Sequence, residues 1–352
     1  MRATITDIVS TPLWLAQLVT GAKSFRDNPV MGSRRLNQMG LHAFRRRTAD
    51  RMAAHRRRGL ARLLSTAERQ AFDEQGFVVR RHALEEGLFR ALRRQAEDLK
   101  VVAREMRQGG TVTRRIGLDR NLLMTWPAAR AVVEDPSIRG LIHYAGSYAG
   151  EPTYQIQSVM AAAGPNGDDP QTQFHSDTFH PTAKAWLFLD DVAEDGGPLA
   201  YIPGSHRLNA ARLEWEREQS LTARVSRDRM HAEGSFRISD SDRAALGLAA
   251  PVCMSVPANT LVVADTSGFH ARSPSLRPSH RVEIYATFRR SPFLPWVGGH
   301  LLALPFVSGR HAAIEMGLQR LFASARFGRG SWTIIDGVSP YDPPTIIAPA
   351  AP

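Results

Sequence analysis

The chain has 352 residues, 43% of them hydrophobic and 22% charged, and its formal net charge at pH 7 is +11. Its one cysteine, Cys253, excludes an intrachain disulfide and a zinc site built from several cysteines, and it favours a reducing, cytoplasmic location. No stretch of the sequence approaches the roughly 18 consecutive apolar residues of a membrane-spanning helix.

Residues 1–65 carry almost all of the excess positive charge, with 13 basic residues against three aspartates. Thr11 and Pro12 predict the start of a helix that continues into a short apolar patch containing Trp14. A second helical stretch, over about 41–64, sets leucines and a phenylalanine among clusters of arginine. We therefore predict a basic, amphipathic, helical N-terminal extension.

Two interpretations of this extension stay open. An arginine-rich amphipathic segment beside a Trp/Leu patch suits a peripheral contact with an anionic membrane, here the inner face of the cell membrane. Alternatively, the Leu/Phe face of the segment packs on the rest of the protein. Nucleic acid is the least favoured partner, because the sequence has no recognised binding motif and little aromatic interleaving.

The next elements are predicted from short patterns. The alternating run 154–159 indicates a strand. Gln157 lies in that run. It either points into the interior, where it would contact a cosubstrate, or lies on an exposed strand face.

His175 and Asp177 form an H-x-D pair ahead of a β-rich run, 184–190. Residues two apart on a strand project from the same face, so this pair can offer an imidazole and a carboxylate to one metal ion. Lys184 is one of only three lysines in the chain. It either assists an anionic group at the mouth of a pocket or extends along the strand to solvent.

A turn at 195–198, a strand at 199–202 and a second turn at 203–206 follow. The polar insertion from about 207 to 250 is partly helical, notably over 209–219, and is either a substrate lid or a surface excursion. It contains a second H-x-[DE] triplet that begins at His231. That triplet lies in an Arg/Asp/Ser-rich stretch without apolar alternation, so we interpret His231 as a solvated surface residue.

Cys253 lies in an apolar run, 252–256, and is expected to be buried. The strand predicted at 259–265 is followed by a small-residue turn and His270, and Arg281 opens the next alternating strand, 281–288. An arginine at this place suits a dicarboxylate, because a planar guanidinium binds a carboxylate through two parallel hydrogen bonds. Beyond it we predict a C-terminal extension, 291–352, with a loop at 291–299, a helix at 311–326 and a proline-rich tail from 339.

Together, the H-x-D pair, the D-G-G-P-L turn at 195–199, the P-G-S-H run at 203–206 and the spacing of His270 and Arg281 resemble the phytanoyl-CoA dioxygenase family. The resemblance covers about residues 66–290, and the stretch 71–79 resembles the family's usual entry into its domain, a short helix that leads to a first strand. It implies a mainly β fold with flanking helices, around a double-stranded β-helix (jelly-roll, cupin-like) core. It also implies Fe(II) held by His175, Asp177 and His270, and 2-oxoglutarate held by Arg281. From their own positions in the sequence, Gln157 and Lys184 are further candidates for cofactor binding. His180 and His206 receive no ligand role.

These observations predict an Fe(II)- and 2-oxoglutarate-dependent dioxygenase that uses O2 to hydroxylate an unactivated C–H bond and releases succinate and CO2. Asp177 favours hydroxylation, because the related halogenases have a small residue in its place. The basic extension favours a small or lipid-linked substrate with anionic character. The competing hypothesis is a non-catalytic double-stranded β-helix protein that acts as a peripheral membrane or complex-binding module.

Overall fold

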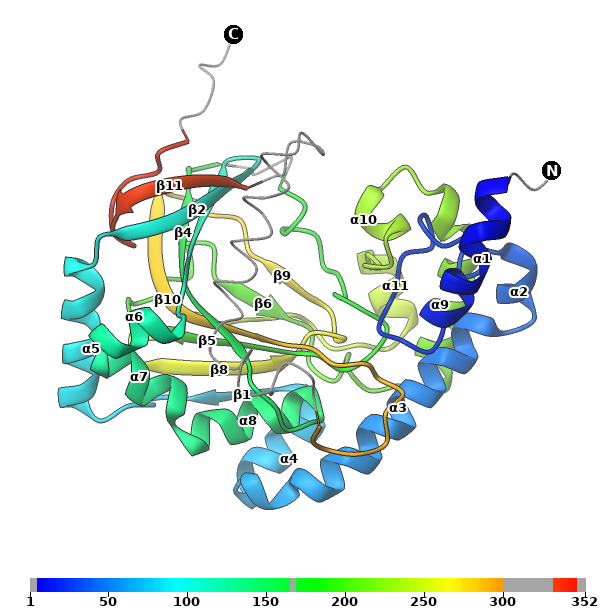
Figure 1. The fold of residues 1–352 in the computed structure, drawn as a ribbon, viewed down its shortest axis with the longest axis horizontal. Coiled ribbons are helices and arrows are strands. Elements are labelled where there is room, and N and C mark those ends of the chain that lie inside the picture. Colours follow the sequence, from blue (N-terminus) through cyan, green and yellow to red (C-terminus); the bar gives the residue numbers. More distant parts are fainter. Residues whose placement is uncertain (1–4, 165–168, 300–331, 347–352) are drawn as a thin grey trace, which may run out of the picture.

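The computed structural model describes residues 5–164, 169–299 and 332–346, and two antiparallel sheets form its centre (Figure 1). The smaller sheet has the strand order β7 (Val252–Cys253), β6 (Leu199–Tyr201) and β9 (His270–Arg272). The larger sheet has eight strands, in the order β1 (Phe77–Arg80), β8 (Thr260–Asp265), β5 (Ala183–Phe188), β10 (Ser279–Phe288), β4 (Thr153–Ala161), β3 (Thr111–Gly117), β2 (Val101–Gln108) and β11 (Thr333–Val338).

The alternation of side chains along β5 explains how the large sheet is buried on both faces. Trp186 and Phe188 belong to the apolar cluster that also contains Tyr201 of the small sheet, while Ala185 and Leu187 belong to the cluster shared with the helices. Successive strand residues point to opposite faces, so one strand contributes to two cores. This arrangement confirms the predicted mainly β fold with flanking helices and a jelly-roll core.

Helices cover the outer face of the large sheet: α4 (Thr66–Gln75), α5 (Glu86–Asp98), α6 (Arg120–Thr125), α7 (Pro127–Glu134) and α8 (Pro136–Gly146) (Figure 1). Ser65 and Glu68 form a capping box that begins α4. Gly76 ends this helix with φ of 89°, and a Cβ at that position would lie 2.5 Å from Nδ1 of His206. Glycine is therefore required at this turn, which leads into β1 as predicted.

The N-terminal segment folds into α1 (Ile5–Gln17), α2 (Arg34–Gln38), α3 (Leu41–Leu60) and the short η1 (Ala61–Leu63). The long helix predicted over 41–64 is confirmed. The predicted helix start at Thr11 and Pro12 is wrong, because α1 begins at Ile5 and contains Pro12 in its interior. Helix geometry tolerates proline best in the first turn, so the sequence rule placed the start too late.

Arginine side chains and the last leucine of α3 join this helix to the rest of the protein, whereas its phenylalanine does not. Arg56 donates from Nε to the carbonyl of Ser147 at 2.7 Å and from a terminal nitrogen to the carbonyl of Leu294 at 2.6 Å. Arg57 pairs with the buried carboxylate of Asp265 at 2.8 Å. In contrast, the side chain of Phe44 is 68% exposed. The helix packs on the body of the protein through its arginines and through Leu60, which is buried in the core that the helices share with the large sheet.

The insertion folds into α9 (Ala210–Thr222), η2 (Ala223–Val225), α10 (Arg229–Ala232) and α11 (Asp240–Ala245), and α9 packs against α2 and α3. Its Glu216 is buried and is contacted by Arg212 at 2.8 Å, Arg46 at 3.3 Å and His42 at 3.2 Å. Burial lowers the pKa of His42, which is therefore a neutral ring that donates to Glu216. A buried charge cluster thus joins the insertion to the N-terminal helices.

Three further sequence predictions concern Cys253, His231 and the C-terminal extension. Cys253 is exposed, not buried, because β7 is an edge strand of the small sheet. His231 is half-buried against the ring of Phe236 rather than solvated. β11, which lies in the predicted C-terminal extension, completes one edge of the large sheet, and the described residues after it, 339–346, are irregular as expected.

The helix predicted at 311–326 lies outside the described residues. Within the described ranges, no helix combines the length and the apolar character needed to cross a membrane.

Candidate metal centre

His175, Asp177 and His270 come together at one end of the small sheet. The backbone of His175 pairs with that of His270 at the start of β9, with N–O distances of 3.0 and 2.9 Å. Asp177 lies in a bend, not in a regular strand, and its N–H donates to the carbonyl of Thr266 at 2.8 Å. One potential ligand atom from each of the three side chains lies within 4.8 Å of the others.

Both imidazoles are oriented by hydrogen bonds from the ring nitrogen that faces away from this group. Nδ1 of His175 donates to the carbonyl of Gln173 at 2.8 Å, and Nδ1 of His270 donates to the carbonyl of Gly268 at 3.1 Å. A carbonyl only accepts, so the proton of each neutral ring lies on Nδ1 and the lone pair on Nε2. The Nε2 atoms lie 3.8 and 3.7 Å from Oδ1 of Asp177. This is the usual orientation of metal-binding histidines.

The charge states also suit a cation. Burial, and then the charge of His270, hold the pKa of His175 well below its usual value, and burial lowers the pKa of His270 to about 4. Burial alone would raise the pKa of Asp177, but Lys184, followed by His270 and Arg289, holds that pKa well below its usual range. At neutral pH the group therefore offers two neutral imidazoles and one carboxylate.

One buried atom lacks a partner that a metal ion would provide. Nε2 of His270 is buried and has no hydrogen-bond partner among the described residues, although leaving such a polar atom unsatisfied is costly. Two imidazole nitrogens and one carboxylate oxygen match the two-histidine, one-carboxylate set of non-haem Fe(II) oxygenases, which leaves coordination positions open for a cosubstrate and O2. The residues present fit Fe(II).

Arg281 of β10 lines the same cavity of about 240 Å³ as the three residues. Its Nε donates to Glu283 at 3.2 Å, and a terminal nitrogen donates to the carbonyl of Gly197 at 2.5 Å. Glu283 also accepts from Gln157 at 2.6 Å. Gln157 is buried and faces this interior cavity, so the exposed-face alternative is wrong, and its amide supports the carboxylate that holds Arg281.

Lys184 lies with Nζ 2.7 Å from Oδ2 of Asp177, so this lysine contacts a candidate ligand directly instead of extending to solvent. Sequence patterns did not reveal Lys23, whose Nζ donates to the carbonyl of Asp177 at 2.5 Å. They also did not reveal four charged residues that line the cavity or support it, namely Arg115, Arg272, Glu283 and Arg289. Arg272 and Glu283 each lie two residues beyond a predicted site residue on the same strand, so the alternation of side chains along a strand could have indicated them. No motif marks Arg115 and Arg289.

The other histidines near the motifs lie outside the three-residue group. His180 donates from Nδ1 to the carbonyl of Pro181 at 3.1 Å, and the ring of His206 packs against Phe72. His231 belongs to α10 and is likewise outside the group. Among the described residues, only His175, Asp177 and His270 form a group of this kind.

The chain matches the model of one known protein family. The phytanoyl-CoA dioxygenase (PhyH) model matches residues 72–254, a little over half of the chain. No curated protein sequence matches the chain.

Similar solved structures include the 2-oxoglutarate-dependent epimerase SnoN of nogalamycin biosynthesis (18% identity, 66% of this chain and 83% of that one, TM-score 0.43). The carbocyclase SnoK of the same biosynthesis is 21% identical over 64% of this chain and 84% of that one, with a TM-score of 0.42. HygX from Streptomyces hygroscopicus, with nickel and 2-oxoglutarate bound, is 16% identical over 70% and 94%, with a TM-score of 0.41. By its match to the family model, the chain belongs to the phytanoyl-CoA dioxygenase family of Fe(II)- and 2-oxoglutarate-dependent oxygenases.

Proposed function

We propose that the protein is a hydroxylase in which His175, Asp177 and His270 hold Fe(II) and Arg281 holds the distal carboxylate of 2-oxoglutarate. The observation that carries this proposal is that two oriented imidazoles, one ionised carboxylate and a buried arginine line one small cavity. The substrate would be a small or lipid-linked molecule with an unactivated C–H bond.

When bound, Fe(II) and 2-oxoglutarate supply the oxidising power for hydroxylation with O2, and succinate and CO2 are released. The side chains and backbone carbonyls of this protein position the residues that would hold these two groups. Gln173 and Gly268 fix the two imidazole rings through their carbonyls, while Lys184 holds the Asp177 carboxylate ionised. Glu283 positions the Arg281 fork for a second carboxylate. The apolar cluster between the sheets keeps bulk water away from this end of the cavity.

Arg281→Gln should raise the apparent dissociation constant for 2-oxoglutarate by roughly 10- to 100-fold, because a charge-assisted bidentate contact is replaced by a neutral one. Fe(II) affinity should change little, since Arg281 is not part of the ligand group. An anaerobic titration with Fe(II) and then 2-oxoglutarate, following the visible charge-transfer band of the metal and cosubstrate, measures both constants.

The matched control for this titration is Arg277→Gln, an exposed arginine that pairs with Asp195. This variant should titrate like the wild-type protein. Equal 2-oxoglutarate affinity in Arg281→Gln and Arg277→Gln would contradict the role given to Arg281. If folded, Fe(II)-loaded wild-type protein shows no band at all, the non-catalytic alternative is favoured.

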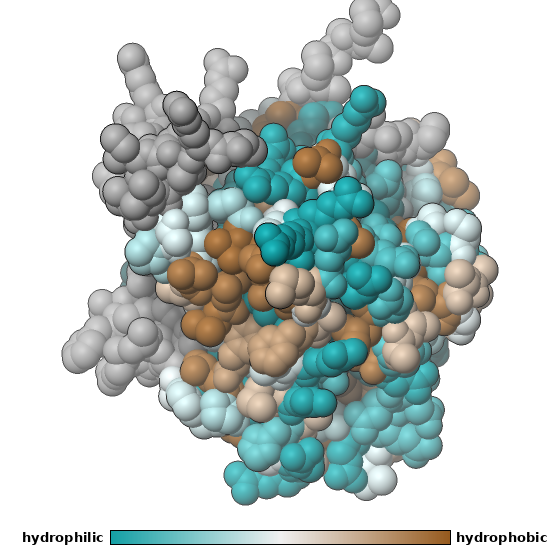
Figure 2. Space-filling view, turned by 90° about the vertical axis from the view of Figure 1, so that its right-hand side faces the viewer, coloured by the Kyte–Doolittle hydropathy of each residue, from teal (hydrophilic) through white to brown (hydrophobic). Residues whose placement is uncertain are grey.

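We also propose that the N-terminal helices contact an anionic membrane. Large apolar side chains are exposed on α1, on the loop after it, just after α2 and on α3, and Figure 2 shows apolar residues gathered on this face beside hydrophilic ones. Exposed arginines occur on α2 and α3. Apolar side chains at the surface next to basic ones suit the headgroup region of an anionic bilayer. The apolar residues are Leu13, Leu15, Val19, Met39 and Phe44.

Deleting residues 1–65 would test membrane contact badly, because Arg56 and Arg57 stabilise the folded body. A point substitution is sharper. Phe44→Asp should reduce co-sedimentation with phosphatidylglycerol/phosphatidylcholine vesicles by about tenfold, because it removes an apolar group and adds a repelled charge. The matched control is Val225→Asp, since Val225 is also exposed but lies on the insertion. Equal binding by the two variants, or none by the wild-type protein, would remove the basis for membrane contact.

A further inference from the structure

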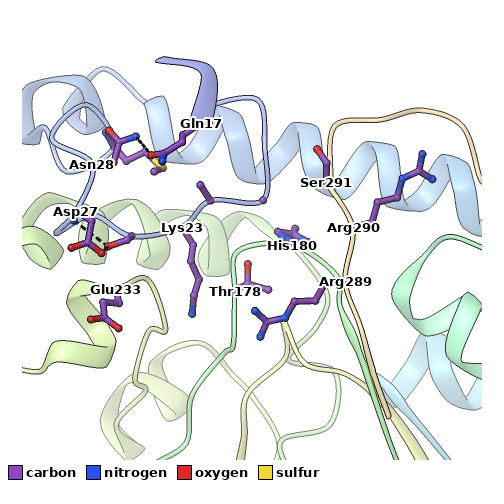
Figure 3. Close-up of a pocket in the computed structure, with 14 residues that line it drawn as sticks. Gln17, Lys23, Asp27, Asn28, Thr178, His180, Glu233, Arg289, Arg290 and Ser291 are labelled. Carbon is purple, nitrogen blue, oxygen red and sulfur yellow. Dashed lines mark hydrogen bonds between the residues drawn. The ribbon is translucent and has the colours of Figure 1, made fainter. Parts of the chain in front are cut away.

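A second cavity, of about 600 Å³, adjoins the metal-binding cavity (Figure 3). Lys23 and Arg289 line both cavities, so the two spaces meet at these side chains. The N-terminal loop after α1 forms one wall, and Thr178, Arg289 and Glu233 come from three other segments. Thr178 follows Asp177 directly, which places the second cavity beside the proposed metal ligands.

The N-terminal wall is held in one position by the insertion. The backbone N–H groups of Phe25 and Arg26 both donate to the carbonyl of Ala232 at 3.1 Å, and the ring of Phe25 is buried. Gly234 has φ of 83°, and a Cβ there would lie 2.3 Å from the carbonyl oxygen of Lys23. The backbone at Lys23 is therefore fixed, and its side chain reaches the Asp177 carbonyl from this loop.

The acidic side chains of the cavity already have partners. Asp27 accepts a hydrogen bond from the hydroxyl of Ser24 at 2.7 Å. Glu233 pairs with Arg229 at 2.7 Å. Neither carboxylate forms an ion pair with Lys23 or Arg289 among the described residues. The charges of these two cations are therefore not neutralised by Asp27 or Glu233.

Arg289 and Arg290 both line this cavity, but their guanidinium groups differ in their hydrogen-bond partners. Arg290 donates from its guanidinium to the carbonyls of Trp296, Val297 and Gly298 at 2.6 to 3.0 Å, and points away from the cavity in Figure 3. The guanidinium of Arg289 has no hydrogen-bond or ion-pair partner within the described ranges, and it extends toward the same space as Lys23.

Positive charge is therefore in excess where the two cavities meet. The charges of Lys184 and Arg237 also act on Lys23, against the single carboxylate of Asp177. A neutral or cationic molecule would leave this positive charge in excess. An anionic group would neutralise it, because an ionised acceptor forms strong hydrogen bonds with Arg and Lys.

We propose that Lys23 and Arg289 form an anion site that binds a phosphate or carboxylate group of the substrate and so positions the rest of the substrate at the metal centre. That the bound molecule is the substrate rests on the proposed hydroxylase function; the anion site itself rests on the cavity and its charges. The N-terminal loop would then be part of the substrate site and not only a surface extension.

The test is anion binding by the metal-free protein, followed as line broadening of inorganic phosphate in 31P NMR and of 13C-labelled acetate in 13C NMR. We expect broadening of at least one anion in the wild-type protein and a roughly tenfold weaker affinity in Arg289→Gln, because a charge-assisted contact is lost. The matched control, Arg94→Gln, removes the same charge from an exposed position on α5, across the molecule, and should bind like the wild-type protein.

Each outcome decides one question. Broadening by phosphate or by acetate identifies which group the site prefers. The proposal is overturned if neither anion binds, if Arg289→Gln binds as well as Arg94→Gln, or if only Arg281→Gln loses binding, since the anion would then occupy the cosubstrate position. The charge-transfer titration of the wild-type protein is read separately. A band without anion binding removes the anion site alone, and anion binding without a band removes the hydroxylase function alone.

Discussion

Asp177→Ala is expected to lower Fe(II) affinity by more than about 100-fold, which exceeds the usual cost of losing an outer hydrogen-bond partner of a metal ligand. The carboxylate is the only negative charge in the three-residue group. Without it, Lys184 loses its partner 2.7 Å away, and Lys23 and Arg289 remain nearby. The variant would thus combine a missing ligand with an unscreened positive cavity that repels a divalent cation. Hydroxylase turnover should fall below detection.

Fe(II) affinity is measured by anaerobic equilibrium dialysis of the wild-type protein and the variant. The chain supplies its own control in the second H-x-[DE] triplet, whose Glu233 lies outside the metal group. Glu233→Ala should bind Fe(II) as the wild-type protein does. If Asp177→Ala binds Fe(II) with wild-type affinity, the metal is held elsewhere and the proposed centre is wrong.

The second large effect concerns stability. Glu216→Ala should lower the free energy of unfolding by about 3–5 kcal/mol, because removal of one member of a buried ion pair leaves uncompensated charge in the interior. Here two arginines are affected. Arg46 and Arg212 are both almost fully buried and both contact the Glu216 carboxylate. A loss of this size is a large share of the roughly 5–15 kcal/mol that stabilises a typical domain.

Urea denaturation followed by tryptophan fluorescence measures this change, and Glu214→Ala is the control on the same helix. Glu214 is 55% exposed and pairs with Arg217 at the surface, where ion pairs contribute only about 0–1 kcal/mol. Comparable midpoints for the two variants would show that the buried cluster contributes little to the stability of the fold.

The candidate metal centre can largely be predicted from sequence, because its residues lie beside recognisable strands and turns. His175, Asp177, His270 and Arg281 each lie beside an apolar run or a turn with a specific pattern. Lys23, Glu283 and Arg289 were not predicted as part of the site. Lys23 reaches Asp177 across 154 residues of sequence, and no local pattern encodes a contact of that kind. The sequence shows the charge of the N-terminal segment, but not the inward direction of one of its lysines.

The strands also divide into those that sequence patterns predict and those that they do not. β5 and β8 are apolar runs and β10 alternates, and sequence patterns place all three within two residues of their bounds. β2 and β3 were missed, because their charged residues resemble those of a surface segment. In the structure Glu105 and Arg114 form a fully buried ion pair between these strands. Polarity predicts exposure only when charged side chains have no partner inside, and the pairing of two strands is decided by the whole fold.

The contacts of α3 also constrain how the protein is made. Arg56 donates to the carbonyls of Pro292 and Leu294, which lie 236 and 238 residues further along the chain. Arg57 donates to Asp265, which lies 208 residues further along. At a translation rate of about 5–20 residues per second, this helix leaves the ribosome on the order of tens of seconds before those partners exist. An arginine-rich helix that waits in water is well solvated and aggregates little. The polar attachment of α3 therefore suits a segment that is synthesised early and docks late.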